Sequence, residues 1–472
     1  MKILVRSRKD ASAVKHAIER ILDSKDHYEI VSLGGYRGEQ LCKAVQEELE
    51  PFTIILLGRK EHEPCIESLT RNNPFTAYIM AKTSKLRNST LEMIVSLLNW
   101  GRARLRLLTS WHQDSFILAN TPGTLLPQIP IHPEGDTYLM TKNGFRLLAE
   151  LSGINDKTSY NKDGVAVMFK YTKGKHIVYF DEFRRIELTF ERGKERPTIH
   201  NFTDKNNNRP NKNFVPVNLD RLLDRNSHVT KLLEGESLKI LSKNTDKHSK
   251  VIVPLSGGKD SAAALIVASQ YFDPSNIYAV YVDTGIDFVE NEHYAEYLSE
   301  RLGVNLVKTK ADVDKGLLYE NMPLPDPRYR WCTGRKLDAL RRTVKRLINA
   351  ENIRYIIVGD RDAESVRRSL RPPMRIDENL GLPVIAPLKY WSGAHVILYI
   401  LSEGYRINAL YEKGFLRLGC YICFALRPSW ELYIMNKIKY FEKIRALRPE
   451  QTRLISAFLQ AKQIELSQSI NG

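Results

Sequence analysis

The stretch VIVPLSGGKDSAAALIVAS, residues 251–269, decides the fold prediction. An apolar run meets two glycines, a lysine, an aspartate and a serine, and an alanine-rich stretch with helical spacing follows. This order predicts a strand, a phosphate-holding turn and a helix. The spacing G-x-x-x-x-G-K-[ST] of the common phosphate loop is absent, so the turn is expected to serve another nucleotide chemistry.

The predicted turn consists of Ser256, Gly257, Gly258 and Lys259. Glycines let backbone N–H groups approach phosphate oxygens closely, and the N-terminus of the following helix adds positive potential. Lys259 adds a full charge, and Ser261 can cap the helix or bind phosphate. The alternative is a tight turn whose glycines serve local geometry alone. That alternative does not explain a lysine and a serine placed together at the helix start.

Strand-like segments alternate with helical stretches on both sides of this turn. VIVPL, IYAVYVD, NLVKTK and YIIVGD are the expected strands from residue 251 onward. Such alternation is typical of an α/β fold with a doubly wound parallel sheet. Ligands of such sheets bind beyond the carboxyl ends of the strands, where the turn lies.

The rest of the chain divides by composition. Residues 1–100 alternate strands and helices and predict a small α/β domain, whereas residues 101–195 predict a β-rich or α+β module. Residues 196–244 are expected to form a linker and a helical connection, with a polar, asparagine-rich loop over 195–214. The doubly wound domain is expected over 245–430, followed by a helical tail over 431–472.

The chain has 472 residues and a net charge of +16. A positive field of this size favours polyanionic partners such as nucleic acid, although a basic surface that mainly maintains solubility is the alternative. No apolar run reaches the roughly 18–20 residues that span a bilayer, and the first residues have no secretory pattern. We therefore expect a cytoplasmic protein without a membrane partner. Five cysteines argue against a disulfide framework, and Cys42 and Cys65 are expected to be structural.

Five segments carry a family resemblance. SGGKDS after a strand resembles the pyrophosphate loop of the N-type ATP pyrophosphatases, which cleave nucleotides between the α and β phosphates. DTG (283–285), RWCTGRKLDALRR (330–342), VGDRDAESVRRS (358–369) and the segment 386–423, which ends in GCYIC, follow in the order of the phosphoadenosine phosphosulfate (PAPS) reductase family. The resemblance covers about residues 245–430 and implies the adenine nucleotide alpha hydrolase-like fold.

Basic side chains follow the expected strand ends and suit phosphate or sulfate, because arginine binds both bidentately. Solvated charge on helix faces is the alternative. Asp283 is expected to hold Mg²⁺ or a ribose hydroxyl, and Glu364 to orient an arginine. The resemblance implies that Lys259, Asp260 and Asp283 are catalytic. The expected nucleotide-binding residues are Ser256, Gly257, Gly258, Lys259, Asp260, Ser261, Asp283, Thr284, Gly285, Arg335, Lys336, Arg361 and Arg368.

Three cysteines suggest a metal centre. Cys420 and Cys423 form a C-x-x-C motif, and Cys332 lies upstream beside Trp331. Iron–sulfur members of the family use a C-C pair with a C-x-x-C to hold a [4Fe–4S] cluster, and Trp331 replaces the first cysteine of that pair. Three thiolates can hold a cubane with one open iron. Zinc with His395 or water as fourth ligand, a redox C-x-x-C, and plain structural thiols are the alternatives.

The reductases of the family also use a nucleophilic cysteine near the C-terminus, in an E-C-G-[LI]-H motif, and no cysteine follows Cys423. The first expectation is therefore an ATP-dependent enzyme that adenylates a substrate, releases pyrophosphate and transfers sulfur through the cluster, with tRNA as one acceptor. The second is a sulfonucleotide reductase that takes its thiol from a thioredoxin-like partner. The third is a non-catalytic nucleotide-binding regulator. A sulfur donor and a homo-oligomer are also expected.

Two N-terminal segments are candidates for RNA contact. Arg102, Arg104 and Arg106 lie between Trp100 and Trp111, a mixture that suits phosphate contact and base stacking. Ordinary helix or strand surface is the alternative. The strands expected within 165–192 resemble small modules that dock on structured RNA. Their candidate side chains are Lys173, Lys175, Arg184 and Arg185.

Overall fold

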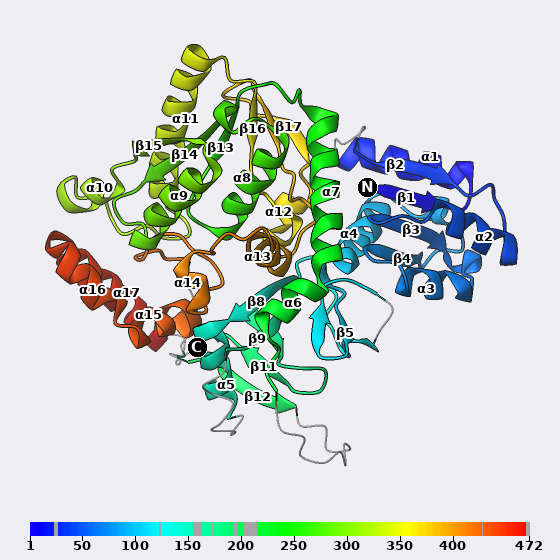
Figure 1. Cartoon of the computed structure of the whole chain (residues 1–472), viewed down its shortest axis with the longest axis horizontal. Coiled ribbons are helices and arrows are strands. Elements are labelled where there is room, and N and C mark those ends of the chain that lie inside the picture. Colours follow the sequence, from blue (N-terminus) through cyan, green and yellow to red (C-terminus); the bar gives the residue numbers. More distant parts are fainter. Residues whose placement is uncertain are drawn as a thin grey trace.

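The computed structural model has three sheet-containing parts that pack around one long helix (Figure 1). It describes residues 1–22, 27–121, 124–153, 163–171, 174–191, 194, 196–202, 215–426 and 428–468. Among these residues, no helix has both the length and the hydrophobicity that crossing a bilayer requires.

The N-terminal part is a four-stranded parallel sheet with helices on both faces. Its strands are β1 (Lys2–Val5), β2 (Glu29–Ser32), β3 (Thr53–Gly58) and β4 (Thr76–Ala81), in the order β2-β1-β3-β4. Its helices are α1 (Arg8–Ala17), α2 (Gly38–Glu48), α3 (Pro64–Arg71) and α4 (Leu91–Leu107). Neighbouring side chains of a strand point to opposite faces, so Leu4 packs with Leu41 of α2 whereas Ile3 packs with Ile94 of α4.

Helices α2 and α3 are joined by a disulfide between Cys42 and Cys65. Both cysteines are thus structural, as predicted, but the disulfide between them was not predicted from the sequence. The two cysteines are 23 residues apart in the chain, and only the packing of both helices on one face of the sheet brings them together.

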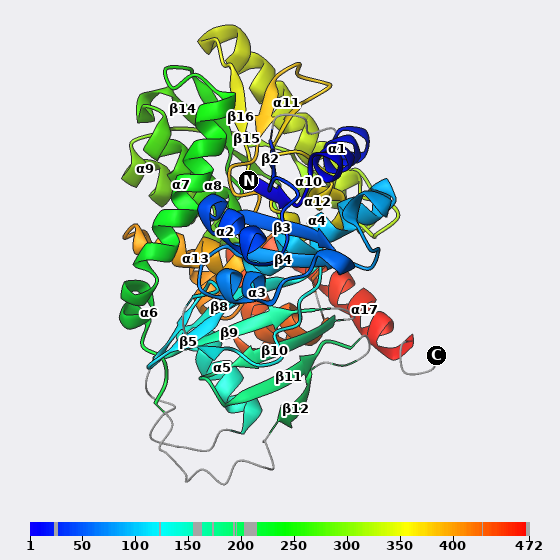
Figure 2. The ribbon, with the colours of Figure 1, turned by 90° about the vertical axis from the view of Figure 1, so that its right-hand side faces the viewer.

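Antiparallel strands follow, below the N-terminal sheet in Figure 2. A small sheet contains β5 (Ser110–His112), β6 (Ser115–Ile117) and β7 (Thr124–Leu125). A five-stranded sheet contains β8 (Asp136–Thr141), β9 (Val165–Lys170), β10 (Lys175–Tyr179), β11 (Arg185–Thr189) and β12 (Thr198–Phe202), with α5 (Lys142–Ser152) between β8 and β9. Strand β12 lies within the segment expected to be a loop, where it pairs with β11 over five residues, so the loop prediction is wrong there.

Helices α6 (Leu219–Arg225) and α7 (Ser227–Asn244) connect these sheets to the last part. In Figure 1, α7 stands between the N-terminal sheet and the C-terminal sheet. Its Glu236 accepts from the amino group of Met1 at 3.3 Å, and its Ser237 donates to the carbonyl of Pro387 at 2.9 Å. The helix thus joins elements that are far apart in sequence.

The C-terminal part is the expected doubly wound sheet, so the fold class is confirmed. Its order is β15-β14-β13-β16-β18-β17, parallel except for β17, which pairs antiparallel with β18. The strands are β13 (Val251–Pro254), β14 (Ile277–Asp283), β15 (Asn305–Lys310), β16 (Tyr355–Ile357), β17 (Met374–Ile376) and β18 (Pro383–Ile385). The strand order reverses between β13 and β16, and ligands bind at such switch points.

The helices of this part are α8 (Lys259–Tyr271), α9 (Val289–Leu302), α10 (Val313–Tyr319), α11 (Trp331–Glu351), α12 (Val366–Ser369), α13 (Gly393–Ser402) and α14 (Ala409–Glu412). The chain continues in α15 (Tyr433–Lys437), α16 (Tyr440–Leu447) and α17 (Thr452–Gln468).

Two of the three arginines of α4 face the protein interior. Arg102 is 2% exposed, pairs with Asp362 at 3.3 Å and donates to the carbonyl of Ser369. Arg106 is equally buried and donates to the carbonyl of Gly135. The hypothesis that Arg102 and Arg106 contact RNA is therefore wrong, because side chains held this way cannot reach a phosphate backbone. Arg104 is exposed and donates to the carbonyl of Tyr78, and its contact with RNA remains a prediction.

The basic candidates of the five-stranded sheet have protein partners. Lys175 pairs with Glu187 at 3.1 Å, and Arg184 pairs with Asp181 at 2.6 Å. The guanidinium of Arg185 lies 6.0 Å from the ring centre of Tyr179. Lys173 lies outside the described residues. An RNA contact by this sheet remains a prediction.

His395 is the third residue of α13 and is buried. Its Nδ1 accepts from the backbone N–H of Ser392, and its Nε2 donates to the carbonyl of Leu118 at 2.7 Å. Both ring nitrogens are thus occupied, so His395 as a fourth zinc ligand is wrong. Burial lowers the pKa of His395 from 6.5 to about 4.

This buried histidine predicts a pH dependence of stability. Below about pH 6.5 the unfolded chain binds a proton that the folded chain excludes, so the unfolding free energy falls between about pH 6.5 and pH 4, by roughly 3 kcal/mol in total. In His395→Gln, which retains a donor for the Leu118 carbonyl, this part of the decline is expected to disappear. Chemical unfolding from pH 7 to pH 4 measures it, with the exposed-histidine variant His248→Gln as control. Equal slopes in wild type and His395→Gln would contradict the assignment.

Candidate nucleotide and thiol site

The turn after β13 has the form expected of a phosphate-binding loop. Gly257 has φ of +73°, which favours glycine, and a Cβ there would lie 2.6 Å from the Cα of Asn291. Ser261 Oγ accepts from the N–H of Ser256 and donates to the carbonyl of Gly258, both near 3 Å. The loop is therefore held closed while the N-terminus of α8 faces outward from the sheet edge.

Lys259, the first residue of α8, is buried with its charge intact. Its Nζ lies 2.9 Å from Asp260, and its backbone N–H donates to the hydroxyl of Tyr411 at 3.0 Å. Burial alone would lower the pKa of Lys259, but Asp260 raises it above the usual value. The ammonium group is thus a fixed positive charge at the end of the turn.

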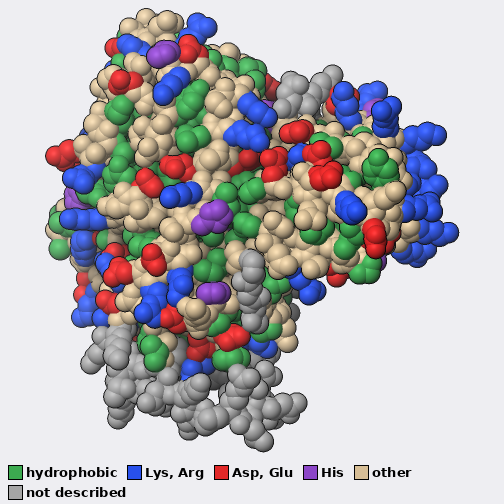
Figure 3. All heavy atoms as spheres, turned by 45° about the vertical axis from the view of Figure 1, so that its right-hand side comes forward, with side chains coloured by type: hydrophobic (Ala, Val, Ile, Leu, Met, Phe, Trp, Pro, Cys, Tyr) green, Lys and Arg blue, Asp and Glu red, His purple; other side chains and the backbone are tan. Residues whose placement is uncertain are grey.

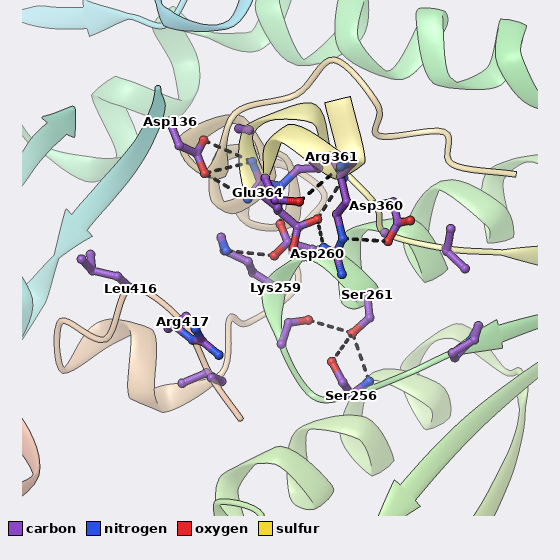
Figure 4. Close-up of a pocket in the computed structure, with 18 of the residues that line it drawn as sticks. Asp136, Ser256, Lys259, Asp260, Ser261, Asp360, Arg361, Glu364, Leu416 and Arg417 are labelled. Carbon is purple, nitrogen blue, oxygen red and sulfur yellow. Dashed lines mark hydrogen bonds and ion pairs between the residues drawn. The ribbon is translucent and has the colours of Figure 1, made fainter. Parts of the chain in front are cut away.

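Arg361 links this turn to the antiparallel sheet (Figure 4). Its Nε lies 2.6 Å from Asp260, and its two terminal nitrogens donate to Asp136 of β8 at 3.1 to 3.2 Å. Arg361 and Asp136 are each 2% exposed. Against the burial, Arg361 and Lys259 lower the pKa of Asp260 to about 2. A carboxylate held in this way is a weak base, so the geometry supports a positioning role for Asp260.

A cavity of about 760 Å³ opens in front of the turn. Residues of the C-terminal part form most of its wall, and β8 and β9 of the antiparallel sheet contribute Asp136, Tyr138 and Lys170. Its further cationic side chains are Lys259, Arg330, Arg361, Arg368 and Arg417. This size and charge suit an anionic ligand such as a nucleotide.

The structure places seven of the predicted residues on this cavity: Ser256, Gly258, Lys259, Asp260, Ser261, Arg361 and Arg368. Gly257, Asp283, Gly285 and Arg335 line neither this cavity nor the thiol cavity described below. Asp283 accepts from the N–H of Gly285 at 2.7 Å, and burial raises its pKa. Arg335 pairs with Glu320 and lies over the ring of Trp331. The ligand roles of all these residues remain predictions.

Sequence reasoning missed several lining residues. Arg330, Tyr411 and Arg417 lie within the segments that carry the family resemblance, so their positions beside the motifs could have predicted that they line the cavity. Asp136 and Lys170 lie more than 80 residues before the turn and outside the resemblance, and no local pattern points to them.

A second cavity, of about 270 Å³, brings the three predicted cysteines together. Cys332, in the first turn of α11, faces it together with Cys420 and Cys423 of the loop after α14. Most of the remaining wall is apolar, and its polar side chains are Ser256, Thr284, Arg330, Thr333 and Lys336. We call it the thiol cavity.

The thiol of Cys420 lies beside a carboxylate. Its Sγ lies 3.5 Å from a carboxylate oxygen of Asp287, and Lys336 Nζ lies 3.9 Å from the same oxygen. Burial and Asp287 raise the pKa of Cys420 well above that of a free thiol. Thiols are the donors that iron–sulfur clusters and zinc require, but no three His, Cys, Asp or Glu side chains of the described residues are grouped to hold a metal ion. The residues as placed thus do not form a metal centre.

The two cavities share a wall. Pro254, Ser256, Arg330, Leu337 and Leu340 line both of them. A ligand on the turn would therefore lie beside the three thiols, with the end of β13 and one face of α11 between them.

The doubly wound sheet and the glycine-rich turn after β13 define an α/β domain with a cationic cavity at the carboxyl ends of its strands. Residues 250–426 match the family model of the phosphoadenosine phosphosulfate reductase domain. Residues 250–426 thus form a PAPS reductase-like domain, and the resemblance seen in the sequence is confirmed for this part of the chain.

Two relatives illustrate the match. An uncharacterised protein of Methanocaldococcus jannaschii is 31% identical over 223 residues, which are 47% of this chain and 45% of that protein. The adenosine 5'-phosphosulfate reductase of Rhodococcus erythropolis is 27% identical over 151 residues, 30% of this chain and 57% of that enzyme. The chain spans about half the length of these relatives.

One solved structure is the phosphate complex of the phosphoadenylyl-sulfate reductase of Candida auris. It is 17% identical, with a TM-score of 0.34, and the match covers 44% of this chain and 98% of that one. A score this low carries no conclusion about function.

The link through Asp136 predicts a large loss of stability when it is broken. Asp136→Asn would leave Arg361 buried with one carboxylate instead of two, and removal of one partner from a buried pair costs about 3–5 kcal/mol. The matched control is Asp163→Asn, because Asp163 is exposed and pairs with exposed Arg146; its effect is expected within about 0.5 kcal/mol. Urea unfolding measures both, and equal effects would contradict a structural role for the link.

Proposed function

We propose that this protein is an enzyme that binds ATP in the large cavity, adenylates a substrate with release of pyrophosphate, and then transfers sulfur from the thiol cavity. The wall that the two cavities share carries the proposal, because it places a nucleotide site and three thiols side by side. The similarity of this domain to adenosine 5'-phosphosulfate reductase supports adenine-nucleotide chemistry.

The turn would bind the β- and γ-phosphates of ATP. Its backbone N–H groups and the N-terminus of α8 supply partial positive charge, and Lys259 supplies a full charge whose raised pKa keeps it protonated. Arg368 and Arg417 reach the same cavity from α12 and from the loop before the C-x-x-C motif. These groups stabilise the negative charge that develops on the leaving pyrophosphate.

In the first step, an oxygen of the substrate attacks the α-phosphorus. A new P–O bond forms, the bond between the α-phosphorus and the bridging oxygen breaks, and pyrophosphate leaves with that electron pair. In the second step, hydrosulfide from a sulfur donor, held at the thiol cavity, attacks the carbon that now carries the adenylyl group and forms a C–S bond. AMP leaves with the C–O bonding electrons and the sulfur loses its proton, so the substrate exchanges oxygen for sulfur.

The chain's own residues would position these steps. Asp260 holds Lys259 and Arg361, so that both cations keep fixed places before ATP arrives. The apolar wall of the thiol cavity excludes water from the sulfur nucleophile. The [4Fe–4S] cluster, Mg²⁺ and a tRNA acceptor remain predictions from the sequence, and no step depends on them.

Sulfonucleotide reduction is the second candidate, favoured by the similarity to adenosine 5'-phosphosulfate reductase. A thiol of a thioredoxin-like partner would attack the sulfur of the bound sulfonucleotide and release the adenine nucleotide. The second thiol of the same partner would then attack the first sulfur and displace sulfite, so that the partner leaves as its internal disulfide.

Lys259 provides the test of the nucleotide step. Lys259→Ala is expected to lower pyrophosphate release from ATP by roughly 10²–10³, because a charge aimed at the developing negative charge is lost. The control is Lys315→Ala, whose side chain pairs with Asp312 and lines neither cavity. A coupled pyrophosphate assay measures the rate with candidate acceptors, including bulk tRNA. Sulfite release from adenosine 5'-phosphosulfate with thioredoxin, without pyrophosphate release from ATP, would favour the reductase.

The thiols provide an independent test of the second step. Cys332→Ser, Cys420→Ser and Cys423→Ser are each expected to abolish sulfur incorporation while pyrophosphate release continues, because these side chains line only the thiol cavity. Anaerobic purification with an absorbance spectrum and iron and zinc counts shows whether a metal is bound. Unchanged sulfur incorporation in all three variants would contradict the role of the thiols.

A further inference from the structure

The strongest unexplained feature lies on the N-terminal domain, away from both cavities. Figure 3 shows Lys and Arg side chains crowded at the outer edge of this domain. Basic residues follow each of the four parallel strands of this domain. They are Arg8, Lys9, Arg37, Arg59, Lys60, Lys82 and Lys85. We call this set the cationic rim.

The topology explains why these seven side chains share one edge. Arg8 and Lys9 follow β1, Arg37 follows β2, Arg59 and Lys60 follow β3, and Lys82 and Lys85 follow β4. All four strands are parallel, so all four loops emerge at the carboxyl end of the sheet. Adjacent strands lie about 4.8 Å apart, so four strands give a rim roughly 14 Å wide.

Buried contacts hold these loops together. Arg6, after β1, donates to Glu61 at 2.6 Å and to the carbonyl of Gly35 at 2.8 Å. The backbone N–H of Arg59 donates to the carbonyl of Thr83 at 2.8 Å, and that of Lys60 to Ser84 at 3.1 Å. Each loop is thereby tied to another, and the rim keeps its shape without a ligand.

The acidic side chains near the rim already have partners within the domain. Glu61 is engaged by Arg6, Asp10 by Arg87, and Glu63 accepts from the backbone N–H of Gly38. Within the described part of the chain, none of the seven rim cations forms an ion pair. Six are exposed and Lys85 is half-buried. This contrasts with Lys2 and Lys308, which each pair with two glutamates.

The rim also presents an aromatic ring. Tyr36 is 48% exposed and lies in the sequence GGYRG, residues 34–38. Gly34 and Gly35 have φ of +69° and +82°, a conformation that keeps this loop tight. An exposed aromatic ring beside clustered cations is the combination that binds single strands, because bases stack on the ring while phosphates meet the charges.

From this geometry we propose that the cationic rim binds a single-stranded nucleic acid segment through its phosphate backbone, with Tyr36 stacking on a base. The spread of the charges over four loops suits a chain of phosphates better than one small anion. The proposal stands apart from the adenylation reaction, because no rim residue lines either cavity. It assigns the nucleic-acid contact to this edge in place of Arg102 and Arg106 of α4, which are buried.

The test is fluorescence anisotropy with the whole protein and labelled 20-nucleotide RNA, single-stranded DNA and duplex DNA of mixed sequence. The triple variant Arg59→Ala/Lys60→Ala/Lys82→Ala is expected to bind single strands at least about tenfold more weakly at 50 mM salt. Its slope of log affinity against log salt should fall by about 2, because each lost phosphate contact removes about 0.7. Tyr36→Ala should weaken binding roughly 5- to 100-fold and leave the salt slope unchanged.

The matched control is Lys231→Ala/Lys239→Ala/Lys243→Ala, which removes three exposed charges from α7. This control variant should bind single strands like the wild type. Comparing the affinities for RNA and for single-stranded DNA shows which sugar is preferred. Equal loss in both triple variants would overturn the assignment to the rim. Absence of binding at 50 mM salt, tighter binding of duplex DNA, or equal binding of poly-L-glutamate would overturn the single-strand proposal. Pyrophosphate release without nucleic acid should be unchanged in all these variants. Failure of the rim proposal can therefore be distinguished from failure of the proposed adenylation reaction.

Discussion

The guanidinium of Arg361 is the constraint on which the site depends. It joins Asp260, beside the phosphate turn, to Asp136 of an antiparallel strand from another part of the chain. A buried ion pair adds little net stability over apolar packing, but losing one partner is costly. The contact therefore acts mainly as a positional constraint, which fixes the antiparallel sheet against the mouth of the nucleotide cavity and brings Tyr138 and Lys170 into its wall.

Opposite charges balance across the site. Around the turn, Lys259 and Arg361 face Asp136 and Asp260, so two cations and two carboxylates are buried together. The internal balance lets the cations stay charged in a low-dielectric environment. The neighbouring cations Arg330, Arg368 and Arg417 remain on the cavity wall, where an incoming polyphosphate would add the negative charge that the wall lacks.

Local patterns made part of this arrangement predictable. The strand, the turn and α8 follow from an apolar run, two glycines and an alanine-rich stretch, each within a few residues of the next. Cys332, Cys420 and Cys423 were expected together, and they do share a cavity, although not as a metal centre. The contact of Asp136 with Arg361 could not be predicted from the sequence, because the two residues are 225 positions apart and no local pattern near either residue indicates the pairing.

The arginines of α4 show why charge alone misleads. Arg102 and Arg106 look like a nucleic-acid surface in sequence, yet Asp362 and carbonyl groups from distant segments enclose them. The rim cations look no different in sequence, and what separates them is that their neighbouring carboxylates already have partners. A basic residue is available to an outside anion only when the fold has neither buried it nor matched its charge. That condition can be judged only after the acidic groups have been assigned to their partners, and in this chain it directs attention to the carboxyl edge of the N-terminal sheet.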